Sequence, residues 1–464
     1  MGQRPIEIPA QPRPAAPAGV SQTFLVLICI VAALGGLLFG FDTAVISGAV
    51  GLFKAEFQLS AIVTGWATGS AIVGCMIGAA IAGALADRFG RRRVLLLSGV
   101  FFAVSAIGCG LAADVNQLVW ARLIGGIGIG IASITSPMYI AEVAPAAIRG
   151  RLVTFQQLAI VSGILVAFFS NALFMQTALA DAAKWRWMFA VETFPALLFI
   201  FLLFFIPESP RFLAQKGETA TALNTLTRIS GPREAEAEME RINEALAGEG
   251  SSFTELLRPG LRRALVIATL LAVFSQVSGI NAIMYYAPEV FKQAGAGDAA
   301  AYSSAVWVGV INFLATIVAM FTVDRLGRRM LLLCGTSFLV LALAAVGYAF
   351  HTGSGGTWVL VAVLAYVAGF AISLGPVPWI IASEFFPTRT RGRAMGVATV
   401  GLWAACYMVS QWFPVMQERL GNAWTFWGFG LVSAVALVFI ALFVPETKGR
   451  SLEEIEQSWL KMGR

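Results

Sequence analysis

Long apolar runs dominate this sequence and leave few folds open to it. Stretches such as 24–40, 94–113, 186–206, 330–350 and 424–444 approach the roughly 20 residues that a helix needs to cross a bilayer. Within lipid, only helices and closed barrels satisfy every backbone hydrogen bond, and barrel strands alternate apolar with polar residues. These runs do not alternate, so the sequence predicts an all-α polytopic membrane protein.

The Lys and Arg residues set the predicted topology. Twelve spans are expected, near 24–50, 61–86, 94–113, 118–141, 152–175, 186–206, 263–291, 303–323, 330–351, 357–383, 394–416 and 424–444. With the N-terminus inside, 26 of the 32 Lys and Arg fall on the inner side, and six lie outside: Lys54, Arg122, Lys184, Arg186, Lys292 and Arg419. The positive-inside rule then places both termini in the cytoplasm. The net charge of +6 therefore reflects the basic residues of the cytoplasmic loops and tails, and it indicates no nucleic-acid partner.

The tail and the cysteines exclude several other classes. Residues 1–20 are rich in Pro and Ala without a basic segment before a cleavage site, so they predict a disordered cytoplasmic tail and not a signal peptide. The five cysteines fall within spans and lack the spacing of a metal site or a disulfide framework. His351, the single histidine, is expected at the outer surface. No nucleophile–base pair suggests an enzyme, and no cofactor is expected.

Three loop motifs occur twice in the same order. They are DRFGRR (87–92) and DRLGRR (324–329), ExxPxxxRGR (142–151 and 384–393), and PESPRFL (207–213) and PETKGRSL (445–452). The repeat predicts two six-helix halves of the same orientation, 21–206 and 263–444, around a midplane cavity suited to alternating access. Residues 207–262 are expected to form a helical cytoplasmic linker, either a plain connection or a latch against the loop motifs. Residues 445–464 are the predicted cytoplasmic C-tail.

Most acidic residues lie in predicted loops, and Asp42 is the clear exception. A charge at mid-bilayer costs about 2.5–3.5 kcal/mol on insertion scales, and such a residue is functional by default. Asp42 is in the first span, and Arg122, at the start of the fourth, is its natural partner. The pair is either a static structural ion pair or, as we favour, a proton-coupling pair that titrates as its exposure changes. Glu192 in the sixth span is a second, weaker candidate.

Uncharged polar and aromatic residues within the spans form a second group. Its members are Gln157, Ser275, Gln276, Asn281, Tyr285, Tyr286 and Trp379. Amides both donate and accept, so each can bind paired hydroxyls, and an indole offers an apolar face to the C–H side of a sugar ring. Each residue alone could simply hold helices together. As a group spread over both halves, they predict a site for a polyol-shaped solute.

The motifs of this chain resemble those of bacterial sugar porters of the major facilitator superfamily, over residues 21–460. They are GFDTAVISGA (40–49), DRFGRR, EVAPAAIRGR, PESPRFL, SGINAIMYYAPEVF (278–291), GPVPW and PETKGRSLEEIE (445–456). The resemblance implies the major facilitator fold and a monomer in the lipid of a bacterial inner membrane, with a sugar or polyol and protons as partners. It further implies sugar contacts from Gln157, Gln276, Asn281 and Trp379, and a cavity lined by Phe39, Tyr285 and Trp403. Asp42 with Arg122 would match the proton-coupling pair of symporters, whereas facilitative members typically carry asparagine at this position.

Three positions depart from the family pattern. Ser275 stands where the seventh-span motif usually has glutamine, and Leu402 and Cys406 stand where xylose-type porters carry amides. The loss of three amides thins the hydrogen-bonding shell. A smaller or less hydroxylated ligand, or a polyol, is therefore an alternative to a fully hydroxylated sugar.

The duplicated loop motifs also predict an inner gate. Its acids and bases are Asp87, Arg91, Glu142 and Arg149 in one half and Asp324, Arg328, Glu384 and Arg391 in the other. Salt bridges among them would close the cytoplasmic side when the site faces out. Because one exposed pair contributes only about 0–1 kcal/mol, the gate needs the whole network.

The favoured function is proton-coupled symport of a hexose or pentose. The alternatives are a facilitative sugar or polyol uniporter and a transporter-like nutrient sensor. The short C-tail disfavours the sensor.

Overall fold

The computed structural model describes residues 22–145, 148–247, 256–386, 388–449, 454, 455 and 459. Every long regular element within these residues is an α-helix. The helices are α1 (Gln22–Glu56), α2 (Ala61–Phe89), α3 (Arg91–Leu111), α4 (Val115–Val143), α5 (Arg149–Met175), α6 (Asp181–Ala190), α7 (Thr193–Leu203), α8 (Pro210–Gln215), α9 (Thr219–Ser230), α10 (Pro232–Ala247), α11 (Pro259–Val277), α12 (Ile280–Gln293), α13 (Asp298–Leu326), α14 (Arg328–Thr352), α15 (Thr357–Ile372), α16 (Val377–Glu384) and α17 (Thr388–Phe443).

Twelve membrane spans can be traced in the described part of the chain. Eleven stretches are long and apolar enough to cross a membrane, and three of them join two helices each: α6 with α7, α11 with α12, and α15 with α16. The last stretch, Thr390–Phe443, is 54 residues long. Within it Gly421 has φ of 78°, a left-handed conformation that interrupts the helix and divides the stretch into two spans. The all-α fold with twelve spans is confirmed.

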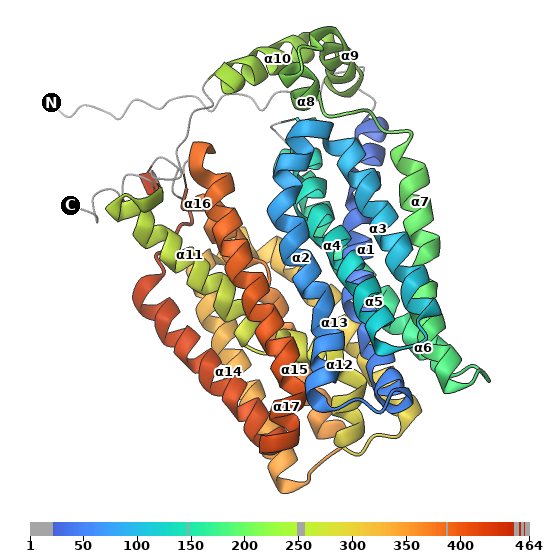
Figure 1. Ribbon diagram of the computed structural model, residues 1–464. Helices are drawn as coiled ribbons and strands as arrows, with labels where there is room; N and C mark the ends of the chain where they lie inside the picture. The colour runs from blue at the N-terminus through green and yellow to red at the C-terminus, as the bar shows by residue number, and fades with distance from the viewer. Residues whose placement is uncertain are drawn as a thin grey trace, which may run out of the picture.

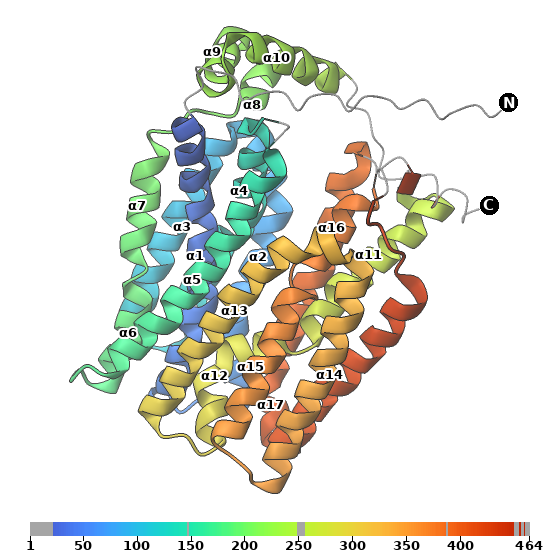
Figure 2. The same cartoon turned by 180° about the vertical axis from the view of Figure 1, so that it is seen from behind.

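The spans form two groups that lie side by side (Figures 1 and 2). We call α1–α7 the first half and α11–α17 the second half. Across their boundary α1 packs against α12, α2 against α17, and α5 against α13. The short helices α8–α10 lie over one end of the first half, which we call the motif end because the duplicated loops also lie there. The opposite end is called the far end.

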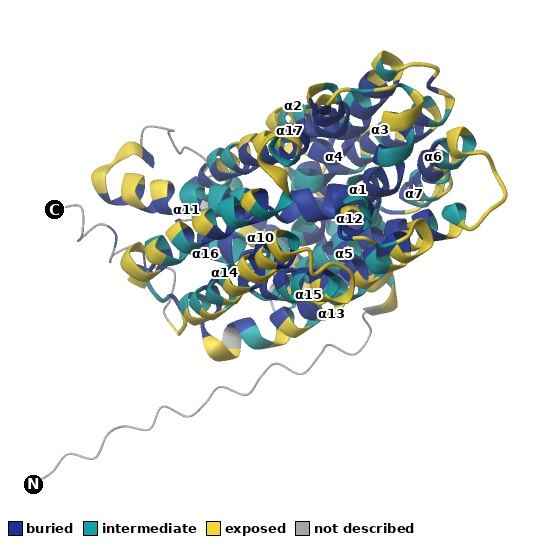
Figure 3. Cartoon of the chain, turned by 90° about the horizontal axis from the view of Figure 1, so that it is seen from below, coloured by how far each residue is buried: buried dark blue, intermediate teal, exposed yellow. Residues whose placement is uncertain are grey.

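Side-chain burial fits a bundle that is surrounded by lipid. Figure 3 shows buried residues gathered inside the bundle and exposed ones towards its outside. Many exposed residues of the spans are large and apolar, such as Phe194, Phe321 and Leu442. In water such a surface would be an aggregation hazard, whereas acyl chains cover it without cost.

Glycines allow two helix pairs to approach closely. A Cβ atom added to Gly126 of α4 would collide with the backbone carbonyl of Ala71 on α2. A Cβ atom on Gly40 of α1 would likewise collide with the carbonyl of Ile160 on α5. Small residues at such contacts let helix backbones meet directly, which is how helices associate in a membrane.

The linker helices α9 and α10 lie within residues 207–262, which the sequence predicts to be helical. Their apolar faces pack together with α8 through Leu213, Leu226 and Met239. Arg149, at the start of α5, donates a hydrogen bond of 3.2 Å to Glu238 on α10. The linker therefore contacts a loop motif of the first half, as the latch alternative requires.

Candidate functional site

A cavity of about 2380 Å³ lies between the two halves. Its wall runs from Phe39 and Asn281 within the spans to Asp87 and Arg151 at the motif end. The halves are held together at the far end. There the Tyr302 hydroxyl (α13) donates to the carbonyl of Gly48 (α1) at 2.7 Å, and the Gln411 amide (α17) donates to the carbonyl of Ile62 (α2) at 2.9 Å. The cavity thus opens at the motif end.

Most of the residues predicted to bind or surround the substrate lie on this wall. They are Phe39, Gln157, Gln276, Asn281, Tyr285, Trp379 and Trp403. Two members of the predicted group are exceptions. Tyr286 is buried and its hydroxyl donates to the carbonyl of Ser410 at 3.1 Å. The Ser275 side chain is also buried and donates to the carbonyl of Ala272 at 2.7 Å. Its hydroxyl also accepts a hydrogen bond of 2.9 Å from Gln276. Ser275 therefore orients an amide of the wall from behind.

A break between α11 and α12 brings two amides together. The expected single span 263–291 is instead two helices separated by Ser278 and Gly279, and Gly279 has φ of 95°. Across this break Asn281 donates to the Gln276 side-chain oxygen, and it also donates to the Cys406 sulfur at 3.2 Å. The break thus turns two residues of different helices towards one point of the cavity.

Aromatic rings from both halves face the same space. Phe39 of α1 and Trp403 of α17 have ring centroids 5.9 Å apart. Trp379 lies on α16, which begins after Pro376, whereas α15 ends at Ile372. The tenth span is therefore broken at the prolines of the GPVPW motif, and Trp379 of that motif lies on the cavity wall.

The predicted ion pair is formed and fully buried. The Arg122 guanidinium donates to the Asp42 carboxylate, and their exposed fractions are only 2% and 1%. Phe189 lies under the guanidinium, with its ring centroid at 5.5 Å. Glu192, at the α6–α7 junction, is also buried and interacts electrostatically with both members of the pair. One carboxylate oxygen each of Asp42 and Glu192 has no hydrogen-bond partner among the described residues.

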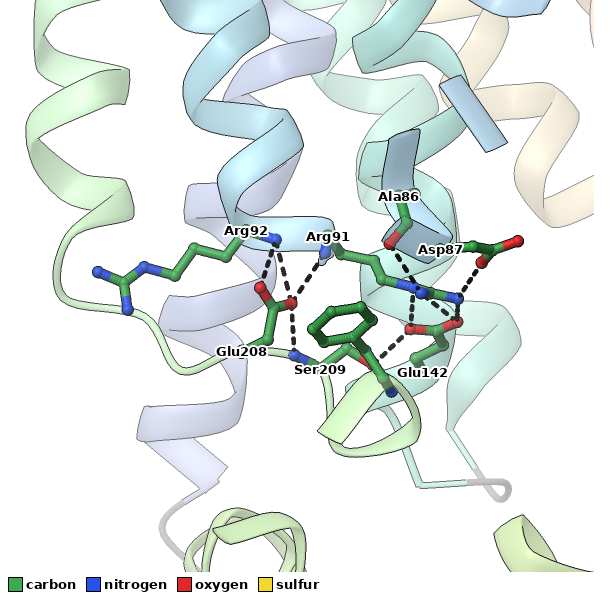
Figure 4. Close-up of polar contacts among 8 residues, drawn as sticks. Ala86, Asp87, Arg91, Arg92, Glu142, Glu208 and Ser209 are labelled. Carbon is green, nitrogen blue, oxygen red and sulfur yellow. Dashed lines mark hydrogen bonds and ion pairs between the residues drawn. The ribbon is translucent and has the colours of Figure 1, made fainter. Parts of the chain in front are cut away.

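The loop motif of the first half forms a compact polar cluster (Figure 4). Arg91 forms ion pairs with Glu142 at 2.9 Å and with Asp87 at 3.2 Å. Ser209 of the PESPR motif donates its hydroxyl to Glu142. Glu208 accepts the backbone N–H of Arg91 at 2.9 Å, at the first residue of α3. A carboxylate thus satisfies N–H groups that a helix start leaves without intrahelical partners.

The second half repeats this geometry. Arg328 pairs with Glu384 at 2.9 Å, and the Thr447 hydroxyl donates to Glu384 at 2.6 Å. Glu446 accepts the backbone N–H of Arg328, the first residue of α14, at 3.0 Å. Burial alone would raise the pKa of Glu446, but N–H donation from the backbone, including that of Lys448, lowers it overall.

The other predicted gate residues differ in what they contact. Arg149 contacts Glu238 on the linker, as described above, and Arg391 donates to the carbonyl of Phe386 at 3.4 Å. The side chain of Asp324 lies outside the described residues. The ion pairs of Arg91 and Arg328 each lie within one half, in a structure whose motif end is open.

Sequence reasoning missed several residues of the site. Gln156 is 6% exposed and lines the cavity beside Gln157, and neither of its amide atoms has a partner among the described residues. Glu208 and Glu446 belong to recognised motifs, but their bonds to helix starts were not predicted. Thr43, next to Asp42, also reaches the wall.

The sequence and the fold of this chain are similar to those of known transport proteins. Residues 28–459 match the family model described as sugar (and other) transporter. The chain is 42% identical over 460 residues to the arabinose-proton symporter of Bacillus subtilis, covering 98% of this chain and 99% of that protein. It is 40% identical to the D-xylose-proton symporter of Escherichia coli K12, covering 95% and 96%. The inward-open structure of the xylose transporter XylE from E. coli superposes with a TM-score of 0.83 at 39% identity, covering 94% of this chain and all of that one.

Proposed function

The chain belongs to the sugar (and other) transporter family, and from that membership we propose that it carries a monosaccharide across the bacterial inner membrane together with a proton. One observation carries the coupling: a fully buried carboxylate–guanidinium pair lies on helices that also form the amide-lined cavity. The test is uptake into proteoliposomes with and without an inward proton gradient. Accumulation that requires the gradient supports symport, and gradient-independent equilibration would indicate a uniporter.

We propose that the motif end faces the cytoplasm. The basic residues of the duplicated loops gather there, and such residues stay on the cytoplasmic side. The cavity is then open to the cytoplasm. Both termini lie on that side, with 21–206 and 263–444 as the two rocking halves and 207–262 as the linker. We further propose that one chain is sufficient for transport, because the cavity is enclosed by helices of a single molecule.

Exposed positions at the two ends test this topology. Glu236 of α10 lies at the motif end, and Ala299 of α13 at the far end. With single cysteines in a background lacking the five native ones, Ala299→Cys should react with an impermeant maleimide in intact cells. Glu236→Cys should react only after the cells are opened. Labelling of both from outside would contradict the orientation.

The substrate is held by groups of opposite character. Amides on α5, α11 and α12 supply donors and acceptors to sugar hydroxyls. Trp379 and the Phe39–Trp403 pair supply apolar faces to ring C–H groups. Gln157 belongs to the first half, and Gln276 and Asn281 belong to the second half. A sugar bound to all three therefore draws the halves together over the site and favours the occluded state.

Two truncations test this site. Gln157→Ala should weaken sugar affinity about tenfold, since a buried hydroxyl that loses its partner costs about 1–3 kcal/mol. Trp379→Ala should weaken the affinity as well, because the apolar face for the ring C–H groups is lost. The measurement is equilibrium binding of radiolabelled sugar to purified protein. Gln417→Ala and Trp358→Ala remove the same side chains at the far end, outside the cavity wall, and should leave the affinity unchanged. Unchanged affinity in both cavity variants would place the site elsewhere.

The duplicated charge clusters are proposed to act as the cytoplasmic gate. In this open form their ion pairs are made within each half, and residues such as Asp87 and Arg393 face the cavity mouth. Closure would bring the two clusters towards each other. Each contact is weak on its own, so the gate depends on the network.

A further inference from the structure

One patch of the cavity wall lacks strong hydrogen-bonding groups. It is formed by Leu402 and Cys406, one helical turn apart on α17, and both line the cavity. Their exposed fractions are 6% and 1%, so a ligand against them would be shielded from water. We call these two side chains the α17 patch.

Most N–H groups of the neighbouring amides are already engaged. Asn281 donates to the Gln276 oxygen and to the Cys406 sulfur, so both of its N–H groups are in use. Gln276 in turn donates to Ser275. A thiol is a weak donor and a weak acceptor, and the sulfur already faces Asn281 and, at 3.8 Å, the Tyr285 hydroxyl. A hydroxyl placed against the α17 patch would therefore exchange its hydrogen bonds to water for a weakly bonding thiol, with no free N–H group of Asn281 beside it.

The chemistry of sugar rings identifies which part of a pyranose fits there. In an aldopyranose whose C1 to C4 are not deoxygenated, each of these four carbons carries a hydroxyl, and only the C5 edge can be free of one. In a pentose that edge is a methylene group, and in a 6-deoxyhexose it carries a methyl group. In a hexose it carries a hydroxymethyl group.

We propose that the α17 patch selects pyranoses that lack a hydroxyl at the C5 edge, pentoses and 6-deoxyhexoses, over hexoses. The selection rests on the proposed function of this cavity in sugar transport. An unpaired buried hydroxyl weakens binding by about tenfold or more, and this sets the expected discrimination. Leu402 and Cys406 are then specificity-determining residues.

Two matched series of sugars test the proposal. D-xylose, 6-deoxy-D-glucose and D-glucose share one ring stereochemistry and differ only at C5, as do L-arabinose, 6-deoxy-D-galactose and D-galactose. Uptake into proteoliposomes is measured for all six. In the series that is transported, the first two members should have a kcat/KM about tenfold above that of the hexose.

Variants separate the patch from other causes of selectivity. Leu402→Gln and Cys406→Asn each add an amide at the C5 edge and should raise the relative kcat/KM of the hexose about tenfold. Leu420→Gln adds the same amide to α17 at a residue that is 54% exposed and not on the cavity wall, and should keep the original ranking. A wild-type hexose rate equal to or above that of its pentose would overturn the selection, and an unchanged ranking in both patch variants would overturn the role of the α17 patch. Failure of all six sugars to enter would overturn the sugar transport on which the proposal rests.

Discussion

Replacement of Asp42 by asparagine should abolish proton-driven accumulation of sugar while sparing binding and exchange. Asparagine has the shape of the protonated acid but cannot titrate. In the wild type the ionised carboxylate holds Arg122, and the pair ties α1 to α4. Protonation would release the arginine and lower the cost of moving a charged pair through the occluded state.

The measurement compares two modes of transport in the same proteoliposomes. Uphill uptake under an inward proton gradient should fall to the equilibrium level in Asp42→Asn. Counterflow, in which sugar exchanges for sugar without net proton movement, should continue. Coupling requires that proton and sugar each favour the same conformational change. A variant that no longer binds the proton should therefore still change conformation in response to sugar.

The paired outcomes also test Glu192, which lies within electrostatic reach of the pair. If Asp42→Asn still concentrates sugar with the pH dependence of the parent, Asp42 is not the coupling site. Glu192→Gln would then be expected to abolish accumulation in its place. Loss of counterflow as well as accumulation in Asp42→Asn would mean that the ion pair is structural.

Replacement of Gly126 by valine should cause a large loss of stability. The new Cβ atom would meet the backbone carbonyl of Ala71 on α2, so α2 and α4 would have to separate. Overpacking of this kind costs about 3 kcal/mol, and a backbone atom cannot move aside as a flexible side chain does. The thermal midpoint of the purified protein in detergent should fall markedly, with little folded protein recovered.

Gly83 provides the matched control for this substitution. It lies within α2, and a Cβ atom added there meets no atom within 4 Å. Gly83→Val therefore carries the same helix propensity change without the collision and should have a midpoint close to that of the parent. Equal midpoints in the two variants would show that the α2–α4 contact tolerates separation.

Much of this architecture could be predicted from the sequence because it follows from hydropathy and repetition. Spans are long and apolar, so their number and order are readable, and Asp42 stands out because a carboxylate is costly in lipid. The sequence could not predict that the side chain of Ser275 is buried behind the cavity wall, because its direction depends on how α11 ends before the turn at Gly279. Leu402 and Cys406 stood out in the sequence because they replace amides of the family pattern, but their place side by side on the cavity wall required the structure.

The contacts of Glu208 were hidden for a different reason. The residue contacts the start of α3 across 117 positions of sequence, and no local pattern reports a contact of that length. Glu446 contacts the start of α14 across 118 positions. The duplicated PESPR and PETKGR motifs place these two acids at equivalent positions, but the motifs do not say what the acids contact.

These two distant carboxylates also have a consequence for biosynthesis. The N–H groups at the start of α3 have no acid to bind until the ribosome has made residue 208, after the sixth span is complete. Those of α14 wait for residue 446, after the twelfth span. Each bundle therefore gains this contact only near the end of its own translation, after three intervening spans, the fourth to sixth or the tenth to twelfth, have been made.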